Sequence, residues 1–190
     1  MNMKNLTFPA RINVNFELAA DVDAYVRQLN GELLTAGFDE ISFSNESKHL
    51  PHLTLLMGDV QSRSLLETMI SKCESIFATS KRITYTLSPP FWKKPSQKFL
   101  FIDTLPTEVF RGFRIQLFGQ IKDQISCEYH GGPENPSHIT VGYGESKRVN
   151  LALLARIPAP AQARTGAMRI CVAGERGTCS EAIASFQSSS

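Results

Sequence analysis

The chain has 190 residues, of which 42% are hydrophobic and 20% charged, and its formal net charge is +2. It is long enough to bury a core in one large domain or two small ones, and its composition is that of a globular protein. The small net charge argues against a surface for long duplex nucleic acid. No apolar run reaches the about 20 residues of a membrane-spanning helix, and the first ten residues lack the apolar segment of a signal peptide. We therefore expect a cytoplasmic protein that does not bind a membrane.

Hydrophobic patterning predicts strands and helices that alternate along the chain. Alternating residues predict a strand over 11–18, and helical spacing predicts a helix over 22–36 that Gly37 ends. The segment 41–47 fits a short strand or a loop. The later predicted elements are a strand over 50–59, a helix capped by Ser62, a strand over 82–87, a loop over 88–97, a strand over 98–105, a helix from Pro106 to about 126, a strand over 137–143, a short helix over 147–156, and strands over 167–173 and 179–186 joined by a turn.

Two short motifs stand out within the predicted strands. His52-Leu53-Thr54 and His138-Ile139-Thr140 each read histidine, apolar residue, threonine, 86 positions apart (138 minus 52). Residues i and i+2 of a strand point to the same face, so each histidine shares a face with its threonine. One such pair is most simply a polar pair on a half-buried strand. Two matched pairs among 4 histidines predict two halves of one site.

The elements around the motifs repeat in the same order. Each motif strand is preceded by a strand and a helix and followed by another helix, although the two halves share negligible sequence identity outside the motifs. No low-complexity linker separates them. We therefore expect residues 1–190 to form a single domain with two internal lobes, each carrying one motif, and a frayed tail over 187–190.

These features resemble the two-histidine (2H) phosphoesterase superfamily, which is defined by two His-x-Thr/Ser motifs on strands in the two lobes of a pseudo-symmetric α+β fold. Pro51 before the first motif and the apolar strand after each motif also match, and the order of elements covers roughly residues 10 to 186. The resemblance implies an α+β fold in which antiparallel sheets form a central cleft with helices outside. It also implies a metal-independent phosphodiesterase that acts on a nucleotide, a cyclic oligonucleotide or an RNA end.

The residue types suit that chemistry. Cleavage of a phosphodiester needs a proton acceptor for the nucleophile, a proton donor for the leaving oxygen and stabilisation of negative charge. Histidine titrates near neutrality and can fill the first two roles. The hydroxyls of Thr54 and Thr140 can donate hydrogen bonds to non-bridging oxygens. We predict His52, Thr54, His138 and Thr140 as catalytic residues, with no cofactor and no metal, because the motifs lack carboxylates at telling spacings.

A second group of residues is predicted to bind substrate. Phe91, Trp92 and Lys93 lie in the Pro-rich loop and combine stacking faces with positive charge, which suits a nucleobase and a phosphate. An equally good interpretation is a hairpin loop whose aromatic rings cover an edge of the core. Tyr143 would point away from His138 in a regular strand, which favours core packing, whereas a bulge at Gly142 would turn it toward the site.

Other polar residues have simpler interpretations. Arg169 could reach the cleft, but surface exposure is favoured, and His49 and His130 lack a threonine at +2 and are assigned to loops or the surface. The four cysteines show no Cys-x-x-Cys spacing, so neither a zinc site nor a redox pair is indicated. Cys171 and Cys179 could meet across a hairpin, but in a cytosolic chain two thiols are the favoured state.

Three functions therefore remain open. The first is opening of a 2′,3′-cyclic phosphate or cleavage of a 2′–5′ linkage, and the second is cleavage of cyclic or 2′–5′ oligonucleotide immune messengers, as viral members of the superfamily perform. The third is a module that binds a nucleotide or RNA end without turnover. Two complete motifs favour an enzyme, because a pure binder has less need of two titrating groups. In each case we expect a monomer.

Overall fold

The computed structural model describes residues 3–38, 40–44, 47, 49–94, 96, 98–127, 132–134, 136–145 and 149–187. The predicted positions of His130 and of residues 147–148 and 188–190 lie outside this part of the chain. The longer helices are α1 (Ala20–Thr35), α2 (Arg63–Ala78) and α3 (Thr107–Ile121), and α4 (Leu151–Leu154) is a single turn. The strands are β1 (Ala10–Glu17), β2 (His52–Val60), β3 (Thr84–Leu87), β4 (Phe91–Trp92), β5 (Phe99–Leu105), β6 (His138–Tyr143), β7 (Ala163–Arg164), β8 (Met168–Ala173) and β9 (Cys179–Phe186); short 3-10 turns cover Met3–Asn5 (η1) and Glu175–Gly177 (η3).

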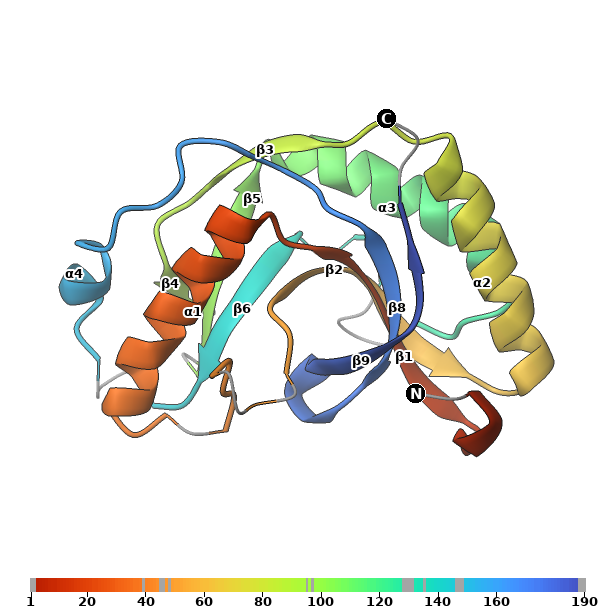
Figure 1. Ribbon diagram of the computed structural model, residues 1–190, viewed down its shortest axis with the longest axis horizontal. Coiled ribbons are helices and arrows are strands. Elements are labelled where there is room, and N and C mark those ends of the chain that lie inside the picture. The colour runs from red at the N-terminus through yellow and green to blue at the C-terminus, as the bar shows by residue number, and fades with distance from the viewer. Residues whose placement is uncertain are drawn as a thin grey trace.

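One antiparallel sheet runs through the molecule and places the two motif strands at its centre. The strand order is β7-β3-β5-β6-β2-β1-β8-β9, with β4 paired to β5. The two motif strands, β6 and β2, are neighbours, and each is flanked by the strand that precedes its motif in sequence, β5 and β1. Figure 1 shows these two halves side by side. The predicted two-lobed α+β fold is therefore confirmed.

The three longer helices begin where the sequence signals predict, to within two residues. The Ser62 hydroxyl accepts a hydrogen bond from the Leu65 N–H and caps α2, and Asp21 and Asp23 lie in the first turn of α1, where acidic residues complement the helix dipole. Pro106 occupies the N-cap position of α3. None of the helices in the described ranges is long and apolar enough to cross a membrane.

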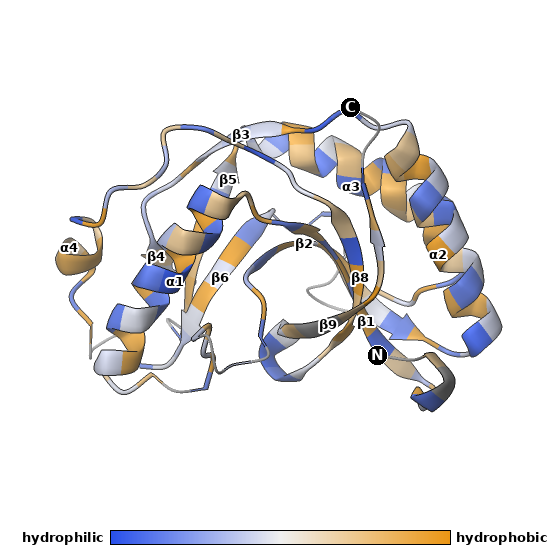
Figure 2. Ribbon diagram, in the orientation of Figure 1, coloured by the Kyte–Doolittle hydropathy of each residue, from blue (hydrophilic) through white to orange (hydrophobic). Residues whose placement is uncertain are grey.

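The helices cover one face of the central strands. Phe16 of β1 packs its ring against Phe77 of α2 and Phe113 of α3, at centroid distances of 5.7 and 5.4 Å. On the other lobe α1 lies against β6. In Figure 2 apolar and polar residues alternate around α1 and α2, as expected for helices with one face on a sheet. This leaves the opposite face of the central strands for polar side chains.

Some local predictions were wrong. Phe91 and Trp92 were assigned to a loop, but they pair with Phe101 and Leu100 of β5 as the short strand β4. The helix from Pro106 ends at Ile121 rather than near residue 126, because the chain then turns so that Ser126 bridges to Asp59. For the segment 41–47 a short strand and a loop were both open, and its residues 41–44 contain no strand, as in the loop interpretation.

The cysteine prediction was also wrong. Cys171 and Cys179 are joined in a disulfide rather than present as two thiols. The strands β8 and β9 form an antiparallel hairpin that brings the two residues together, with Cα atoms 5.8 Å apart. Cys73 and Cys127 are free. The hairpin considered from the sequence is thus present, and the argument for two thiols, which rested on an expected cytosolic location, failed.

Candidate active site

The two motifs lie beside each other on adjacent strands. Leu53 pairs with Ile139, and both side chains are fully buried on the helix side of the sheet. Because alternate residues point to opposite faces, the histidine and threonine of each motif project from the other face. We call this side, which carries His52, Thr54, His138 and Thr140, the histidine face. Antiparallel pairing around Leu53 and Ile139 sets the histidine of each motif against the threonine of the other.

Both histidines are held by the same local hydrogen bond. The Nδ1 atom of His52 lies 2.8 Å from the carbonyl oxygen of Leu50, and Nδ1 of His138 lies 3.0 Å from that of Pro136. Each acceptor stands two residues before its histidine. Because a carbonyl only accepts, Nδ1 must carry the proton in both rings. In the neutral state Nε2 therefore holds the lone pair of each imidazole and is the atom available for proton transfer.

Each motif is followed at once by a β-bulge. Along β1 and β2, Val14 pairs with Leu56 and Asn15 with Thr54, which leaves Leu55 as the extra residue. Along β5 and β6, Leu100 pairs with Gly142 and Phe101 with Thr140, which leaves Val141 as the extra residue. The extra residue reverses the alternation of side chains beyond it. Met57 and Tyr143 therefore join the histidine face, three residues after the motif threonines.

Buried polar side chains from the helices bind the carbonyls of both bulge residues. The Asn30 amide of α1 donates to the Val141 oxygen over 2.8 Å, and the Arg114 guanidinium of α3 donates to the Leu55 oxygen over 2.5 Å. Asn30 is 1% exposed and Arg114 2%. A bulge takes its extra residue out of the ladder, so these carbonyls need other donors. The helices thus fix the irregular backbone directly behind each motif.

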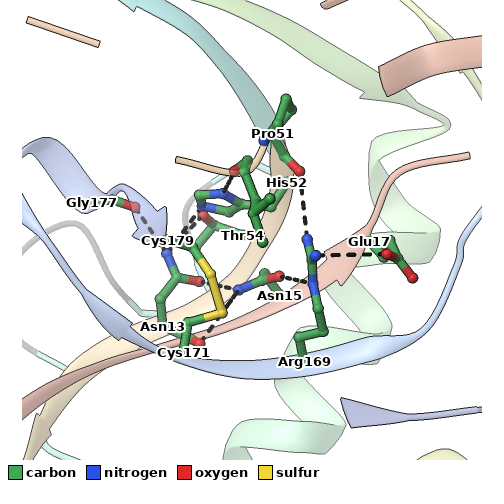
Figure 3. The surroundings of a disulfide bond; sticks show 11 residues. Asn13, Asn15, Glu17, Pro51, His52, Thr54, Arg169, Cys171, Gly177 and Cys179 are labelled. Atoms are coloured by element: carbon green, nitrogen blue, oxygen red, sulfur yellow. Dashed lines mark hydrogen bonds and ion pairs between the residues drawn. A yellow bond between two sulfur atoms is a disulfide. The ribbon is translucent and has the colours of Figure 1, made fainter. Parts of the chain in front are cut away.

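His52 is surrounded by amide groups. The Asn13 Nδ2 atom lies 3.2 Å from His52 Nε2, 3.4 Å from Thr54 Oγ1 and 3.1 Å from the Gly177 carbonyl oxygen (Figure 3). The Asn15 amide donates to Asn13 Oδ1 over 3.2 Å. Both asparagines are fully buried. An unbroken polar network therefore runs along β1 beneath the first motif.

Arg169 belongs to this network, and its predicted surface exposure was wrong. Its side chain is 7% exposed and lies opposite Asn15 in the pairing of β8 with β1. The guanidinium approaches Asn15 Oδ1 at 3.4 Å, the Pro51 carbonyl oxygen at 3.5 Å and the Glu17 carboxylate at 3.7 Å (Figure 3). Arg169 therefore connects the network to the residue immediately before His52.

His138 is surrounded by aromatic rings instead. Its imidazole stacks on Phe101 with centroids 3.9 Å apart, and Phe99 contacts both Phe101 and Tyr143, at 5.5 and 4.7 Å. The Lys93 ammonium lies 5.4 Å from the centroid of Phe101. Phe101 occupies the register position that Asn15 holds in the first half, and Phe99 the position of Asn13. The two halves share a backbone but differ in polarity.

Burial shifts the titration of both histidines. It lowers the pKa of His52 to about 4, with a smaller contribution from the positive charge of Arg169. It lowers the pKa of His138 to about 4 as well, and the charge of Lys93 acts in the same direction. Desolvation disfavours the charged imidazolium, so both rings are neutral at pH 7 in the free protein. An anion bound between them would favour protonation of one.

The predicted substrate-binding residues divide between the two faces. Phe91 pairs with Phe101 and lies on the histidine face, with the centroids of the two rings 6.4 Å apart. Lys93 contacts Phe101, and Tyr143 contacts Phe99 of the same aromatic cluster. Trp92 does not join them. It pairs with the buried Leu100 and packs against the core, with Phe38 at 5.8 Å. For Trp92 the interpretation as a cover for the core edge was correct, whereas the bulge brings Tyr143 to the site.

Sequence reasoning missed several residues around the motifs. Asn13 and Asn15 were counted as the polar half of an alternating strand, which is typical of a solvated face. In the structure β1 is an inner strand between β2 and β8, and the side chains of Asn13 and Asn15 are both fully buried. Phe101 was similarly taken as part of an apolar strand. A pair of asparagines two residues apart, inside a strand of Ile, Val and Phe, was the available signal for a buried polar network.

The side chains around the motifs do not form a metal-binding set in the described part of the chain, where no group of three or more His, Cys, Asp or Glu residues is placed to hold an ion. The catalytic candidates are therefore the two histidines and two threonines themselves. The residues that contact them are amides on one side and aromatic rings with one lysine on the other.

Comparisons with known proteins identify the fold. No protein-family model matches the chain, and no curated protein matches its sequence. Escherichia coli LigT in complex with phosphate is 15% identical with a TM-score of 0.66, covering 97% of this chain and 100% of LigT. LigT in complex with 3′-AMP has a TM-score of 0.68 at 16% identity, and the match covers 96% of this chain and 99% of LigT. Usb1 of Kluyveromyces marxianus has a TM-score of 0.52 at 13% identity, and the match covers 94% of this chain and 98% of Usb1. The resemblance to the 2H phosphoesterases is thus confirmed at the level of the fold.

Proposed function

We propose that this protein is a metal-independent phosphodiesterase that acts on a small nucleotide or an RNA end. The observation that carries the proposal is the matched pair of motifs on adjacent strands. In both, Nδ1 is bound to the carbonyl two residues before, and Nε2 is left as the reacting atom. Two such imidazoles on one face of a sheet can act on opposite sides of one phosphate. The solved structures of LigT with phosphate and with 3′-AMP support a nucleotide ligand for this fold.

The proposed reaction uses one neutral and one protonated histidine. The neutral imidazole accepts a proton from the attacking hydroxyl as the new P–O bond forms; this hydroxyl is water or, at a 2′–5′ linkage, the neighbouring ribose 3′-OH. The protonated imidazole gives its proton to the leaving oxygen as the old P–O bond breaks. The hydroxyls of Thr54 and Thr140 donate to the non-bridging oxygens and stabilise the charge that develops there. With water the product is a monoester, and with the 3′-OH it is a 2′,3′-cyclic phosphate together with a released 5′-OH.

The aromatic half of the site favours a nucleotide among phosphodiesters. Phe91 and Tyr143 are partly exposed, and they lie in the aromatic cluster over which the Lys93 ammonium is placed. A nucleobase stacks on such rings, and a phosphate is attracted by the lysine. We propose that the substrate lies with its base over this half and its scissile phosphate between the histidines. The substrates that fit best are a 2′,3′-cyclic phosphate and a 2′–5′ linkage.

Product analysis by mass spectrometry tests this function. The protein, treated with EDTA, is incubated with RNA ends bearing a 2′,3′-cyclic phosphate, with a 2′–5′ oligoadenylate and with cyclic oligonucleotides. We expect turnover by the wild type, and a loss of at least about a hundredfold in His52→Ala and in His138→Ala, since each removes a general acid or base. His49→Ala, a histidine outside both motifs, should keep its activity. Turnover by the double histidine variant at the wild-type rate would disprove the proposal, and binding without turnover would favour a nucleotide-binding module.

A further inference from the structure

The loop closed by the disulfide contacts both halves of the site. Cys171 and Cys179 join β8 to β9, and the turn between them includes Arg176 and Gly177. The Gly177 carbonyl accepts a hydrogen bond from the Asn13 amide in the first half. The Arg176 guanidinium lies 4.1 Å from the centroid of Tyr143 in the second half. A covalently closed turn thus bridges the amide side and the aromatic side of the histidine face.

The same turn is connected to both nitrogens of His52. The carbonyl of Cys179 accepts a hydrogen bond from the Leu50 N–H over 2.7 Å, and the Leu50 carbonyl in turn binds His52 Nδ1. On the other side the Asn15 amide lies 3.4 Å from Cys171 Sγ. Asn15 also donates to Asn13 Oδ1 and so orients the Nδ2 atom of Asn13 toward His52 Nε2 (Figure 3). Each cysteine therefore stands at one end of a short chain of contacts that ends on the imidazole.

Asn13 is placed to control both the position of the His52 ring and its protonation state. Its Nδ2 hydrogens face His52 Nε2, Thr54 Oγ1 and the Gly177 oxygen at 3.1–3.4 Å. An amide donor at Nε2 favours the neutral imidazole, because a protonated Nε2 would meet another donor. Asn13 cannot simply turn its oxygen to the ring, because Oδ1 accepts the hydrogen bond from Asn15. His138 is contacted instead by the ring of Phe101, which occupies the register position of Asn15.

We propose that Asn13 is a positioning residue for His52 and Thr54, and that the Cys171–Cys179 disulfide holds it in place through Asn15 and Gly177. The inference deepens the proposed function, because it assigns the residues that prepare one of its two histidines. Asn13 acts through His52 and Thr54, whose Nε2 and Oγ1 atoms it contacts, and not on the substrate itself. Both sulfurs are fully buried, so the disulfide is part of the packed support of the site.

The proposal is tested first by replacing the amide donor with an acceptor of the same shape. Asn13→Asp puts a carboxylate next to Nε2, which stabilises the imidazolium, so the pKa of His52 should rise by at least about one unit. The pKa of His138, which the charge of His52 also lowers, should shift less than that of His52. Histidine ring resonances followed by NMR against pH report both residues in one sample and need no substrate. An unchanged titration of His52, or an equal shift of both histidines, would overturn the assignment.

The disulfide is tested by the double variant Cys171→Ala/Cys179→Ala, with Cys73→Ala as a control for loss of a buried cysteine outside the network. We expect a pKa of His52 that moves back toward 6.5 and a kcat that falls about tenfold, as a displaced catalytic group would cause. The control should retain the wild-type values of both. A folded double variant, verified by its NMR dispersion, that keeps the wild-type His52 titration and kcat would refute the role of the disulfide.

The two readouts separate this inference from the function on which it rests. If the wild type turns over none of the substrates, the proposed phosphodiesterase fails, while the His52 titration of the Asn13 and cysteine variants still tests the positioning network. If the wild type is active but Asn13→Asp leaves the titration of His52 and the pH profile of kcat unchanged, the function stands and the network is refuted.

Discussion

Acidification should destabilise the protein through His52, and the structure sets the size of the effect. The imidazole is 9% exposed, and burial lowers its pKa from 6.5 to about 4. The unfolded chain takes up this proton near pH 6.5, whereas the folded protein takes it up only near pH 4. The unfolded state therefore binds more protons between these values. The stability that depends on neutral His52 is fully present above pH 6.5 and is lost as the pH falls toward 4.

The expected loss can be worked out from the two pKa values. One pKa unit of difference between folded and unfolded states corresponds to about 1.4 kcal/mol. With values of 6.5 and about 4, the free energy of unfolding should fall by about 2 kcal/mol between pH 7 and pH 5, and by about 3 kcal/mol at pH 4. This is a large part of the about 5–15 kcal/mol that stabilises a typical domain.

Urea unfolding of the wild type and of His52→Gln at pH 7, 6 and 5 measures this contribution. Glutamine does not titrate, so the variant keeps every other source of pH dependence. The wild type should lose about 2 kcal/mol more than the variant between pH 7 and pH 5. The absolute stability of the variant at pH 7 does not enter the comparison. If the two proteins lose stability in parallel, His52 is not buried in its neutral form and the reasoning is refuted.

Three further outcomes are expected. Thr54→Val and Thr140→Val should each lower kcat about ten- to a hundredfold, while Thr→Ser at either position retains the hydroxyl and most of the rate in the same assay. The reaction needs one neutral and one protonated histidine, and both pKa values are about 4. The value of kcat/KM should therefore peak near pH 4 and fall about tenfold per pH unit above that. A plateau from pH 5 to 8 would contradict this. Gly58→Ala places a Cβ 2.3 Å from a backbone oxygen and should cost about 1–3 kcal/mol in urea unfolding, whereas Gly31→Ala, in a helix with open space around it, should not destabilise the protein.

The sequence predicted the fold well because its signals are local and periodic. The alternation of β1, the helical spacing of α1 and the Ser62 cap each report on a few neighbouring residues, and the structure follows them. The motifs themselves were found because they are duplicated. Their positions on adjacent strands follow from the pairing of Leu53 with Ile139, which no local pattern encodes.

The surroundings of the histidines were harder to predict, because they depend on which strands become neighbours. Arg169 looks like a surface residue until β8 is placed against β1, where it meets Asn15. Cys171 and Cys179 look like ordinary thiols until the hairpin brings them together. Tyr143 changes faces because of an extra residue at Val141, and a bulge has no reliable signature in a single sequence.

The two bulges change how such a site should be searched for in other sequences. A regular strand would present positions 0, +2 and +4 of each motif on one face. Because Leu55 and Val141 each shift the alternation by one residue, this protein presents positions 0, +2 and +5 instead. The first two positions are the same in both halves, but the third is Met57 in one and Tyr143 in the other. Position +5 is therefore where two copies of one histidine–threonine motif acquire different neighbours, and a search pattern built on strict alternation would pass over it.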